Sequence, residues 1–514
     1  MSSRSATAAP KRAYPLDLWS RLLMAGLLVL AIVIMLLGDH ATVRVQKFSW
    51  QDAAVGVEDQ AFVLTFNRPM DTASVEAGLT ISPPLPGRIS WAGRRMAYTL
   101  DHPIPYGESF QISLPTARDR LADPDTETQF EAFRASFRSR DRAFAYIGTE
   151  GDQRGRLVLV NLSQSPQPTI LTPPDLTVLD FEPYPLGDRI LFSAIAAEQP
   201  ESGGFNPTLY TVATGLTQPP PQDVFGETTL PAPIAAAAGT LETVLLGDQY
   251  QNLAFDLAPD GLTLVVQRVN REDPGDFGPW VMVDGSEPRP LVTEPGGEFL
   301  IAPDSATLLM LQGQGTAIIP LDQDPDAETG TQPLDFLPEF GRVFDLTSDG
   351  RSAAMVDFNQ NNPALRFTQS LVLVDNQGEE TELLNVPGSI LDAQFSPRDR
   401  ILYVLASRVL PGEIYQEQAT LVAVPVDNPE PIDLVTFAPQ NQVTMSVAPD
   451  GLALLLAATP TLADDADPNV TPAPVSQLWL LTPFQTAQQR QNDIPSPSTP
   501  EALPFSGQKP TWLP

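Results

Sequence analysis

Histidine and cysteine, the residues that most often carry nucleophilic or metal chemistry, are nearly absent from this chain. Its 514 residues contain no cysteine, which excludes thiolate chemistry, disulfides and a lipid anchor on an N-terminal cysteine. The two histidines are His40 and His102, and we expect a polar surface role for each. Neither a Ser–His–Asp arrangement nor a histidine-ligated metal can therefore form within residues 141–514.

Lysines and phosphate-binding glycine motifs are equally scarce. The lysines are Lys11, Lys47 and Lys509, so a buried lysine that forms a Schiff base with a substrate is not expected. No P-loop or dinucleotide fingerprint occurs, because the glycines fall mostly in turns. We predict no bound cofactor.

Carboxylates are plentiful, and two of them could act as the acid and the base of glycan hydrolysis. Sequence spacing does not select a pair among the 49 acidic residues of the segment 141–514, and we expect most of them in turns and on the surface. Asp322, Asp324 and Asp326 resemble the start of a calcium loop, although the glycine at the sixth position and the acid at the twelfth are missing. They form the one candidate metal site, and no catalytic residue is predicted.

The acidic residues are unevenly distributed. Residues 1–140 hold 15 basic and 14 acidic residues, net +1, whereas residues 141–514 hold 15 and 49, net −34. The second segment should repel nucleic acid and anionic lipid headgroups, with solubility as the alternative role of its charge. At the boundary stands a basic cluster that either fixes the orientation of two domains or forms a solvated strand face. Its members are Arg134, Arg138, Arg140 and Arg142.

A strand–turn–strand unit recurs along the acidic segment. In Asn252–Val269 an alternating apolar run, the turn APDG and a second apolar run predict an antiparallel hairpin. Pro259 pre-sets the turn, Asp260 can bond nearby backbone, and Gly261 takes a positive φ. Each copy is followed by a third apolar run and often by a fourth. The turns recur at steps of 74, 44, 45, 49 and 52 residues, at Pro185, Pro259, Pro303, Ser348, Pro397 and Pro449.

These turns resemble the WD-like repeats of TolB-type propellers, in which a turn of the form SPDG follows the first strand. The matching residues are Ala258–Gly261, Ala302–Ser305, Thr347–Gly350, Ser396–Asp399 and Ala448–Gly451. A period of about 40–50 residues with four strands favours a β-propeller over an ordinary sandwich. Residues 143–172 lack a first strand, and Lys509–Pro514 could supply it. We therefore expect seven blades closed by the C-terminal strand over residues 141–514, with six or eight as alternatives.

An apolar run near the N-terminus predicts a membrane anchor. Leu22–Gly38 has seventeen residues without a charge, and basic residues precede it, so we expect a transmembrane helix at 22–38 and a cytoplasmic tail at 1–21. A cleaved signal peptide is the alternative, but the sequence GDHATV offers no small-x-small cleavage site. The expected localisation is the plasma membrane in a single pass, with the C-terminal domains extracytoplasmic (periplasmic).

The segment between anchor and repeats resembles the bacterial Ig-like domains of envelope proteins. The matching residues are Phe66–Asp71 (FNRPMD), Val75, Ile81–Trp91 (ISPPLPGRISW) and Pro105–Leu114 (PYGESFQISL). The resemblance implies an antiparallel β-sandwich over residues 42–138 that serves as a spacer or adhesive module without chemistry. RDRLADPD departs from the family pattern, because it lacks the glycine usual before the last strand.

The sequence as a whole predicts an all-β protein that binds rather than catalyses. We expect a membrane-anchored extracytoplasmic scaffold whose non-catalytic propeller binds a protein partner, which is basic if the acid excess contributes to recognition. No nucleic acid partner is expected. The alternatives are a propeller enzyme with carboxylate chemistry on a glycan and a sensor of a small ligand.

Overall fold

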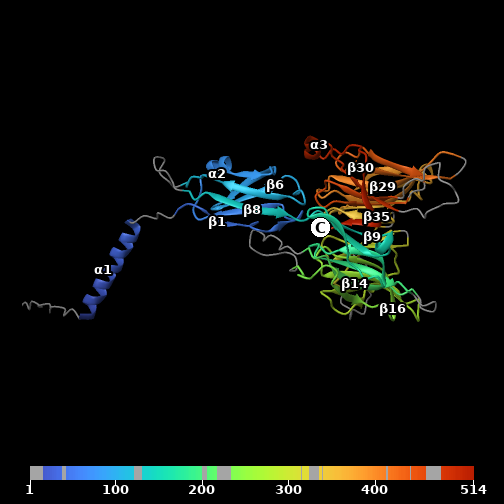
Figure 1. The fold of residues 1–514 in the computed structure, drawn as a ribbon, viewed down its shortest axis with the longest axis horizontal. Coiled ribbons are helices and arrows are strands. Elements are labelled where there is room, and N and C mark those ends of the chain that lie inside the picture. The colour runs from blue at the N-terminus through green and yellow to red at the C-terminus, as the bar shows by residue number, and fades with distance from the viewer. Residues whose placement is uncertain are drawn as a thin grey trace, which may run out of the picture.

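A computed structural model describes residues 15–36, 42–120, 130–198, 205–216, 233–313, 315–322, 335–337, 340–412, 415–439, 442–458 and 476–514. The described chain is all-β apart from short helical segments and one N-terminal helix (Figure 1). The helical segments are α1 (Pro15–Leu36), α2 (Thr72–Gly78), α3 (Ala487–Gln491) and the 3-10 turns η1 (Gly151–Gln153) and η2 (Pro363–Leu365).

The predicted transmembrane helix at Leu22–Gly38 is wrong. Within the ranges of the chain that the structure describes, no helix is long and apolar enough to cross a membrane. Helix α1 begins at Pro15 and carries Asp17 and Arg21 in its first turns. Its uncharged part, from Leu22 to the last helical residue, is about 22 Å long, which is shorter than the roughly 30 Å of a hydrocarbon core. The predicted single-pass anchor and the localisation built on it are therefore wrong, and membrane binding through this helix has no support.

Residues 43–139, the first unit, form two four-stranded sheets around one hydrophobic core. Trp50, Phe62, Phe66 and Phe110 are fully buried in that core. One sheet has the order β1 (Val45–Phe48), β3 (Ala61–Phe66), β6 (Arg95–Leu100) and β5 (Gly87–Ala92). The other has the order β2 (Ala54–Val55), β8 (Phe133–Ser139), β7 (Ser109–Leu114) and β4 (Thr80–Ser82).

The predicted antiparallel Ig-like sandwich is not found in the first unit. Strands β2 and β8 pair in parallel, with Ala54 opposite Arg138. Between β3 and β4 the chain forms helix α2, in which Ala73, Glu76 and Ala77 are good helix formers and Val75 is buried against the core.

Residues 143–514, the second unit, form six antiparallel sheets (Figure 1). Five have four strands in chain order: β12 (Leu176–Pro183) to β15 (Leu241–Leu245), β16 (Tyr250–Leu257) to β19 (Arg289–Pro290), β20 (Phe299–Ile301) to β23 (Asp335–Leu337), β24 (Val343–Leu346) to β27 (Glu380–Val386), and β28 (Gly388–Phe395) to β31 (Ile432–Pro439). Their inner members are β13 (Arg189–Ala196), β14 (Thr208–Ala213), β17 (Thr263–Asn270), β18 (Phe277–Val283), β21 (Thr307–Gln312), β22 (Gly315–Pro320), β25 (Ser352–Asp357), β26 (Gln369–Asp375), β29 (Ile401–Val409) and β30 (Glu417–Pro425).

The sixth sheet has seven strands and overturns the predicted ring of separate four-stranded blades. Its order is β11 (Ser165–Ile170), β10 (Leu157–Asn161), β9 (Ala143–Gly148), β35 (Glu501–Trp512), β34 (Gln477–Leu481), β33 (Leu454–Ala458) and β32 (Val443–Val447). The first half of β35 pairs with β34 and the second half with β9. Among the described residues a closed seven-bladed propeller is not found, because this one long strand pairs with two groups of strands and joins them into one sheet.

The hairpin turns have the geometry that the sequence predicts. In the turn after β16, the backbone N–H of Gly261 donates to Ala258 O at 2.8 Å, and Gly261 has a φ of 67°. Asp260 accepts from the backbone N–H groups of Leu262 and Thr263 at 2.7 and 2.9 Å. The turn after β32 repeats this arrangement, with a φ of 68° at Gly451.

Candidate functional site

Three carboxylates of the second unit are bonded to the backbone of neighbouring sheets. Each stands near the end of the first strand of its sheet and accepts an N–H from the first strand of the next sheet. The bonds join Glu182 Oε2 to Leu257 N (2.9 Å), Asp256 Oδ2 to Ile301 N (2.5 Å) and Asp345 Oδ2 to Phe395 N (2.8 Å).

The same repeat position carries uncharged acceptors in the later sheets. Gln394 Oε1 accepts from Val447 N at 3.0 Å, and Ser446 Oγ accepts from Trp512 N at 3.2 Å. Leu300 occupies the position in β20 and has no acceptor to offer. An amide and a hydroxyl replace the acids in these sheets and still accept the backbone N–H. The role shared by this position across the sheets is therefore hydrogen bonding and not proton transfer.

Removal from water raises the pKa of these acids. Burial raises the pKa of Asp256 to about 6 and that of Asp345 to about 7, and their backbone donors oppose the shift. Burial raises the pKa of Glu182 still further above its ordinary range, with the nearby Asp256 charge adding to the effect. These shifts resemble those of catalytic acids, but they follow from where the residues sit between the sheets.

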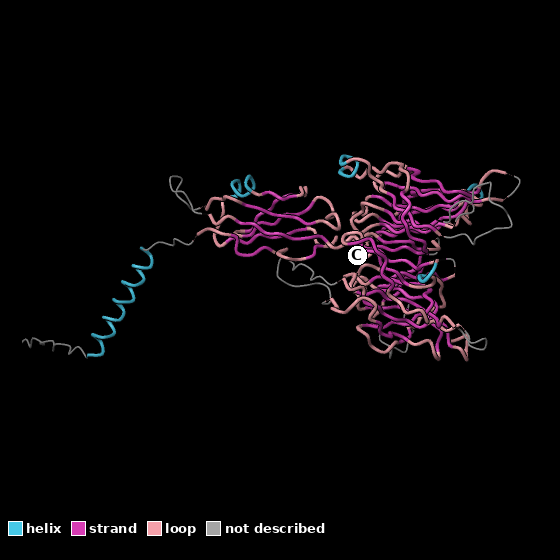
Figure 2. The backbone as a smooth tube through the Cα atoms, viewed as in Figure 1, coloured by secondary structure: helices cyan, strands magenta, loops and turns pink. Residues whose placement is uncertain are grey.

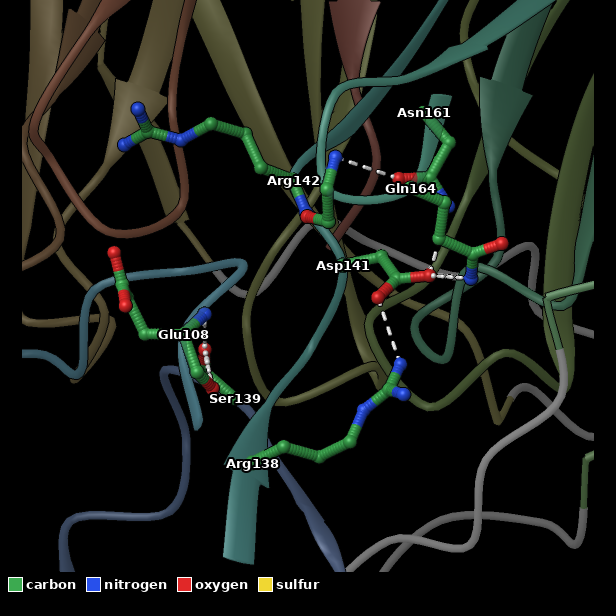
Figure 3. Close-up of polar contacts among 8 residues, drawn as sticks. Glu108, Arg138, Ser139, Asp141, Arg142, Asn161 and Gln164 are labelled. Carbon is green, nitrogen blue, oxygen red and sulfur yellow. Dashed lines mark hydrogen bonds and ion pairs between the residues drawn. The ribbon is translucent and has the colours of Figure 1, made fainter. Parts of the chain in front are cut away.

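The members of the basic cluster at the boundary differ in role, and Figure 3 shows two of them, Arg138 and Arg142. Arg138 donates to Asp141 Oδ1 at 2.7 Å, and Asp141 Oδ2 accepts from Asn161 and Gln164 at 2.8 Å each. Asp141 thus ties the last strand of the first unit to β10 and the turn that follows it. Arg134, in contrast, is exposed on the face of β8, as the alternative hypothesis expected.

Two further arginines of the cluster join the units directly. Arg140 is buried, forms an ion pair with Glu58 of the first unit and donates to Pro185 O of the second at 3.0 Å. Arg142 donates to Asp450 Oδ2 at 2.7 Å. The cluster therefore fixes the junction of the two units, which was one of the two roles predicted for it.

His102 lies at this junction rather than on the open surface. It lines a cavity of about 280 Å³ together with Asp59, Pro397 and Asp399. Its Nε2 is buried and has no hydrogen-bond partner among the described residues. Burial and the neighbouring Glu58 raise the pKa of Asp59 to about 7. His40 lies outside the residues that the structure describes.

Most of the predicted calcium ligands lie outside the residues that the structure describes. Asp322 is exposed, and Asp324 and Asp326 are not among the described residues. Within the described part of the chain, no group of three or more His, Asp or Glu side chains is placed to hold a metal ion.

A groove of about 1,140 Å³ lies between three connections of the second unit. These are the β25–β26 connection (residues 358–368), the β27–β28 turn and the β29–β30 connection. Figure 2 shows η1 and η2 as short helical turns on the side of the second unit that faces away from the first unit, and η2 belongs to the first of these connections. The groove is lined by Phe358, Asn359, Gln360, Asn362, Pro363, Arg366, Phe367, Thr368, Gln369, Pro387, Gly388, Ser389, Val409, Leu410, Pro411 and Tyr415.

Large aromatic side chains in this groove face solvent. Phe367 is 84% exposed, Tyr415 69% and Phe358 41%. Phe367 also has a φ of 70°, a left-handed conformation that is rare for a bulky residue. Exposed aromatic rings gathered in one groove are typical of binding surfaces.

Several polar side chains of the groove are already hydrogen-bonded within the protein. Asn359 Nδ2 donates to Thr368 Oγ1 at 3.0 Å and to Ser370 Oγ at 3.1 Å. Asn362 caps η2 by accepting from Ala364 N at 3.1 Å, and the Tyr415 hydroxyl donates to a neighbouring glutamate. Apolar surface, the Gln360 amide and the Arg366 guanidinium remain for a ligand.

This groove was not predicted from the sequence. The local signal was the segment FNQNNPALRF, in which two phenylalanines bracket a polar, proline-containing connection. Such phenylalanines have no strand periodicity and no core to enter, so their exposure could have been suspected. Their meeting with Val409 and Tyr415, some fifty residues further along, depends on how the sheets pack.

Comparisons with known proteins give likenesses of fold only. No protein-family model and no curated protein matches the chain. Among solved structures, it is similar to TolB from Acinetobacter baumannii (13% identity, TM-score 0.35, 69% of this chain and 79% of that chain). It is also similar to a putative TolB from Agrobacterium tumefaciens (14%, 0.33, 72% and 92%) and to an oligogalacturonate lyase in complex with manganese (12%, 0.39, 59% and 79%). TM-scores below 0.5 carry no argument about what this chain does.

Proposed function

We propose that this chain is a binding protein that docks a protein partner in the groove between Phe358 and Tyr415, without turnover. The observation that carries the proposal is the exposure of three aromatic side chains in one groove, next to Asn359 and Asn362, whose side chains are already hydrogen-bonded within the protein. Aromatic side chains buried at the centre of an interface supply much of its binding free energy. A partner that covers Phe367 and Tyr415 would remove apolar surface from water.

The alternative of a glycan-cleaving enzyme has less support. Each of the candidate carboxylates Glu182, Asp256 and Asp345 holds a backbone N–H of the next sheet. A small-ligand sensor is also less well supported. The groove exceeds the usual volume of roughly 300–1,000 Å³ for such sites, and the amides of Asn359 and Gln369 are already hydrogen-bonded within the protein.

The overall charge favours a partner that is basic as a whole. The net charge of −33 acts over about a Debye length, 8 Å at physiological salt. It would therefore speed the approach of a basic protein more than it would strengthen the contact itself. The association rate should fall as salt rises.

A site-specific photo-crosslinker tests the docking site. Benzoylphenylalanine would replace Phe367 in the full chain, and Ile494, which is 52% exposed and lies outside the groove, would be the matched control position. We expect a crosslinked partner at position 367 that untagged chain competes away, and no such product at 494. Equal crosslinking at both positions, or saturable glycan hydrolysis that Asp256→Asn abolishes, would contradict the proposal.

A further inference from the structure

We propose that the groove receives an extended segment of the partner in which a carboxylate lies next to apolar side chains, with Arg366 as the site for the carboxylate. This inference rests on the proposed docking function and adds the chemistry of the bound segment. It concerns the contact in the groove, whereas the basic character of the whole partner concerns its approach from a distance.

Arg366 is the charged residue of the groove. No Asp or Glu is among the lining residues that the structure describes, although the chain has 63 acidic residues against 30 basic ones. The guanidinium lies 5.3 Å from the centre of the Phe367 ring, and no ion pair joins it to a carboxylate of the described residues. A guanidinium stacked on an aromatic ring keeps its planar set of donors free to bind a carboxylate through two hydrogen bonds.

The backbone at Phe367 presents these two side chains together. Arg366 ends η2, and Thr368 N donates to Leu365 O at 3.0 Å, which closes a tight turn around the pair. Phe367 adopts its left-handed φ while its ring stays in solvent, so burial of the ring in the free protein does not account for the conformation. Strained backbone of this kind is found preferentially where a side chain is held for a ligand.

The remaining walls favour an extended apolar segment over a sugar or a strand. Pro363, Pro387 and Pro411 have no N–H to donate, so they offer nothing to a pairing strand at these places. The side-chain oxygen of Gln369 accepts from Ile390 N at 2.8 Å and is therefore already hydrogen-bonded within the protein. Recognition must then come from side chains, with Phe367 and Tyr415 contacting apolar groups and Arg366 the acid.

A random 12-residue peptide library displayed on phage, selected on the full chain, tests the chemistry. Selection on Phe367→Ala serves to subtract peptides that bind elsewhere. We expect peptides with Asp or Glu next to Leu, Phe or Pro, and a synthetic winner should bind about tenfold more weakly when its acid is replaced by the amide, a typical effect of losing one charge-assisted pair.

Variants of Arg366 separate the two proposals. When peptides are selected on Arg366→Gln, the enrichment of Asp and Glu should disappear while the enrichment of apolar residues remains. Selection on Arg366→Lys should keep part of the enrichment of Asp and Glu. Both variants lie at an exposed position and should keep the melting temperature. Two outcomes would overturn the carboxylate site and leave docking intact. In the first, the enriched peptides contain no Asp or Glu; in the second, Asp or Glu is enriched equally when the selection is made on Arg366→Gln. No enrichment over Phe367→Ala would overturn docking and the carboxylate site together.

Discussion

Asp450 Oδ2 lies 2.7 Å from Arg142 Nη2 and also accepts the backbone N–H of Tyr106 at 3.0 Å. Asp450 belongs to the turn after β32, so a turn residue of the second unit holds a loop of the first unit, at Tyr106, and the linker between the units, at Arg142. Its other oxygen accepts from Leu452 N at 3.0 Å. Asp260 is the equivalent residue of the turn after β16, and its carboxylate accepts from Leu262 and Thr263 within its own turn.

The first prediction compares these two aspartates. Asp450→Ala should lower the free energy of unfolding by about 3–5 kcal/mol, because Asp450 is 4% exposed and its loss leaves Arg142 and the Tyr106 N–H without their acceptor. Asp260→Ala is the matched control and should cost about 1 kcal/mol through its turn alone. Urea unfolding followed by tryptophan fluorescence measures both, and equal losses would show that the junction bond contributes little.

The second prediction concerns pH and Asp345. Its pKa is raised from an ordinary value of 3.8 to about 7, so the folded protein keeps a proton that the unfolded chain releases earlier. The contribution of Asp345 to the free energy of unfolding is therefore fully present below pH 4 and is lost as pH rises from about 4 to about 7. Asp345→Asn keeps an acceptor for Phe395 N, as Gln394 does naturally for Val447, and should reduce the fall in stability over this range.

Unfolding in urea at pH 5 and pH 8 measures this effect. The free energy of unfolding of Asp345→Asn minus that of the parent should be larger at pH 8 than at pH 5. Asp304→Asn, in the exposed turn after β20, is the control and should leave the difference between the two pH values unchanged. A parent and an Asp345→Asn variant with the same pH dependence would rule out Asp345 as its source.

The third prediction concerns β35. Removal of Phe505–Pro514 should destabilise the second unit strongly, since it exposes the edge of β9 and removes Trp512, whose buried ring packs edge-on against Phe144 at 5.7 Å. Loss of a buried tryptophan side chain alone costs about 3–5 kcal/mol. An unchanged melting temperature by calorimetry would mean that this pairing is dispensable.

The fourth prediction uses a glycine under the groove. A methyl group at Gly341 would collide with the ring of Phe358, so Gly341→Ala should displace that ring and weaken partner or peptide binding. Gly278→Ala meets no atom within 4 Å and is the matched control for the added methyl group. Titration calorimetry with a selected peptide measures both, and equal affinities would show that Phe358 does not shape the groove.

The sequence alone determined the local units of this protein. Apolar alternation and the turn residues Asp260 and Gly261 act within about ten residues, so the hairpins and their turn geometry could be predicted. The scarcity of histidine, cysteine and lysine likewise needs no structure to limit the chemistry.

Only the tertiary structure decided how these units combine. The predicted pairing of the C-terminal strand with residues 143–148 is confirmed. The period of the repeats does not tell that the same strand also pairs with β34, and the predicted closed ring of seven blades is wrong. Nor does it tell that Asp450 bonds the first unit while Asp260 bonds its own turn, or that Phe367 meets Tyr415. Strand pairing and side-chain contacts across hundreds of residues depend on how apolar faces pack together, and that packing is set by the whole chain rather than by any local pattern.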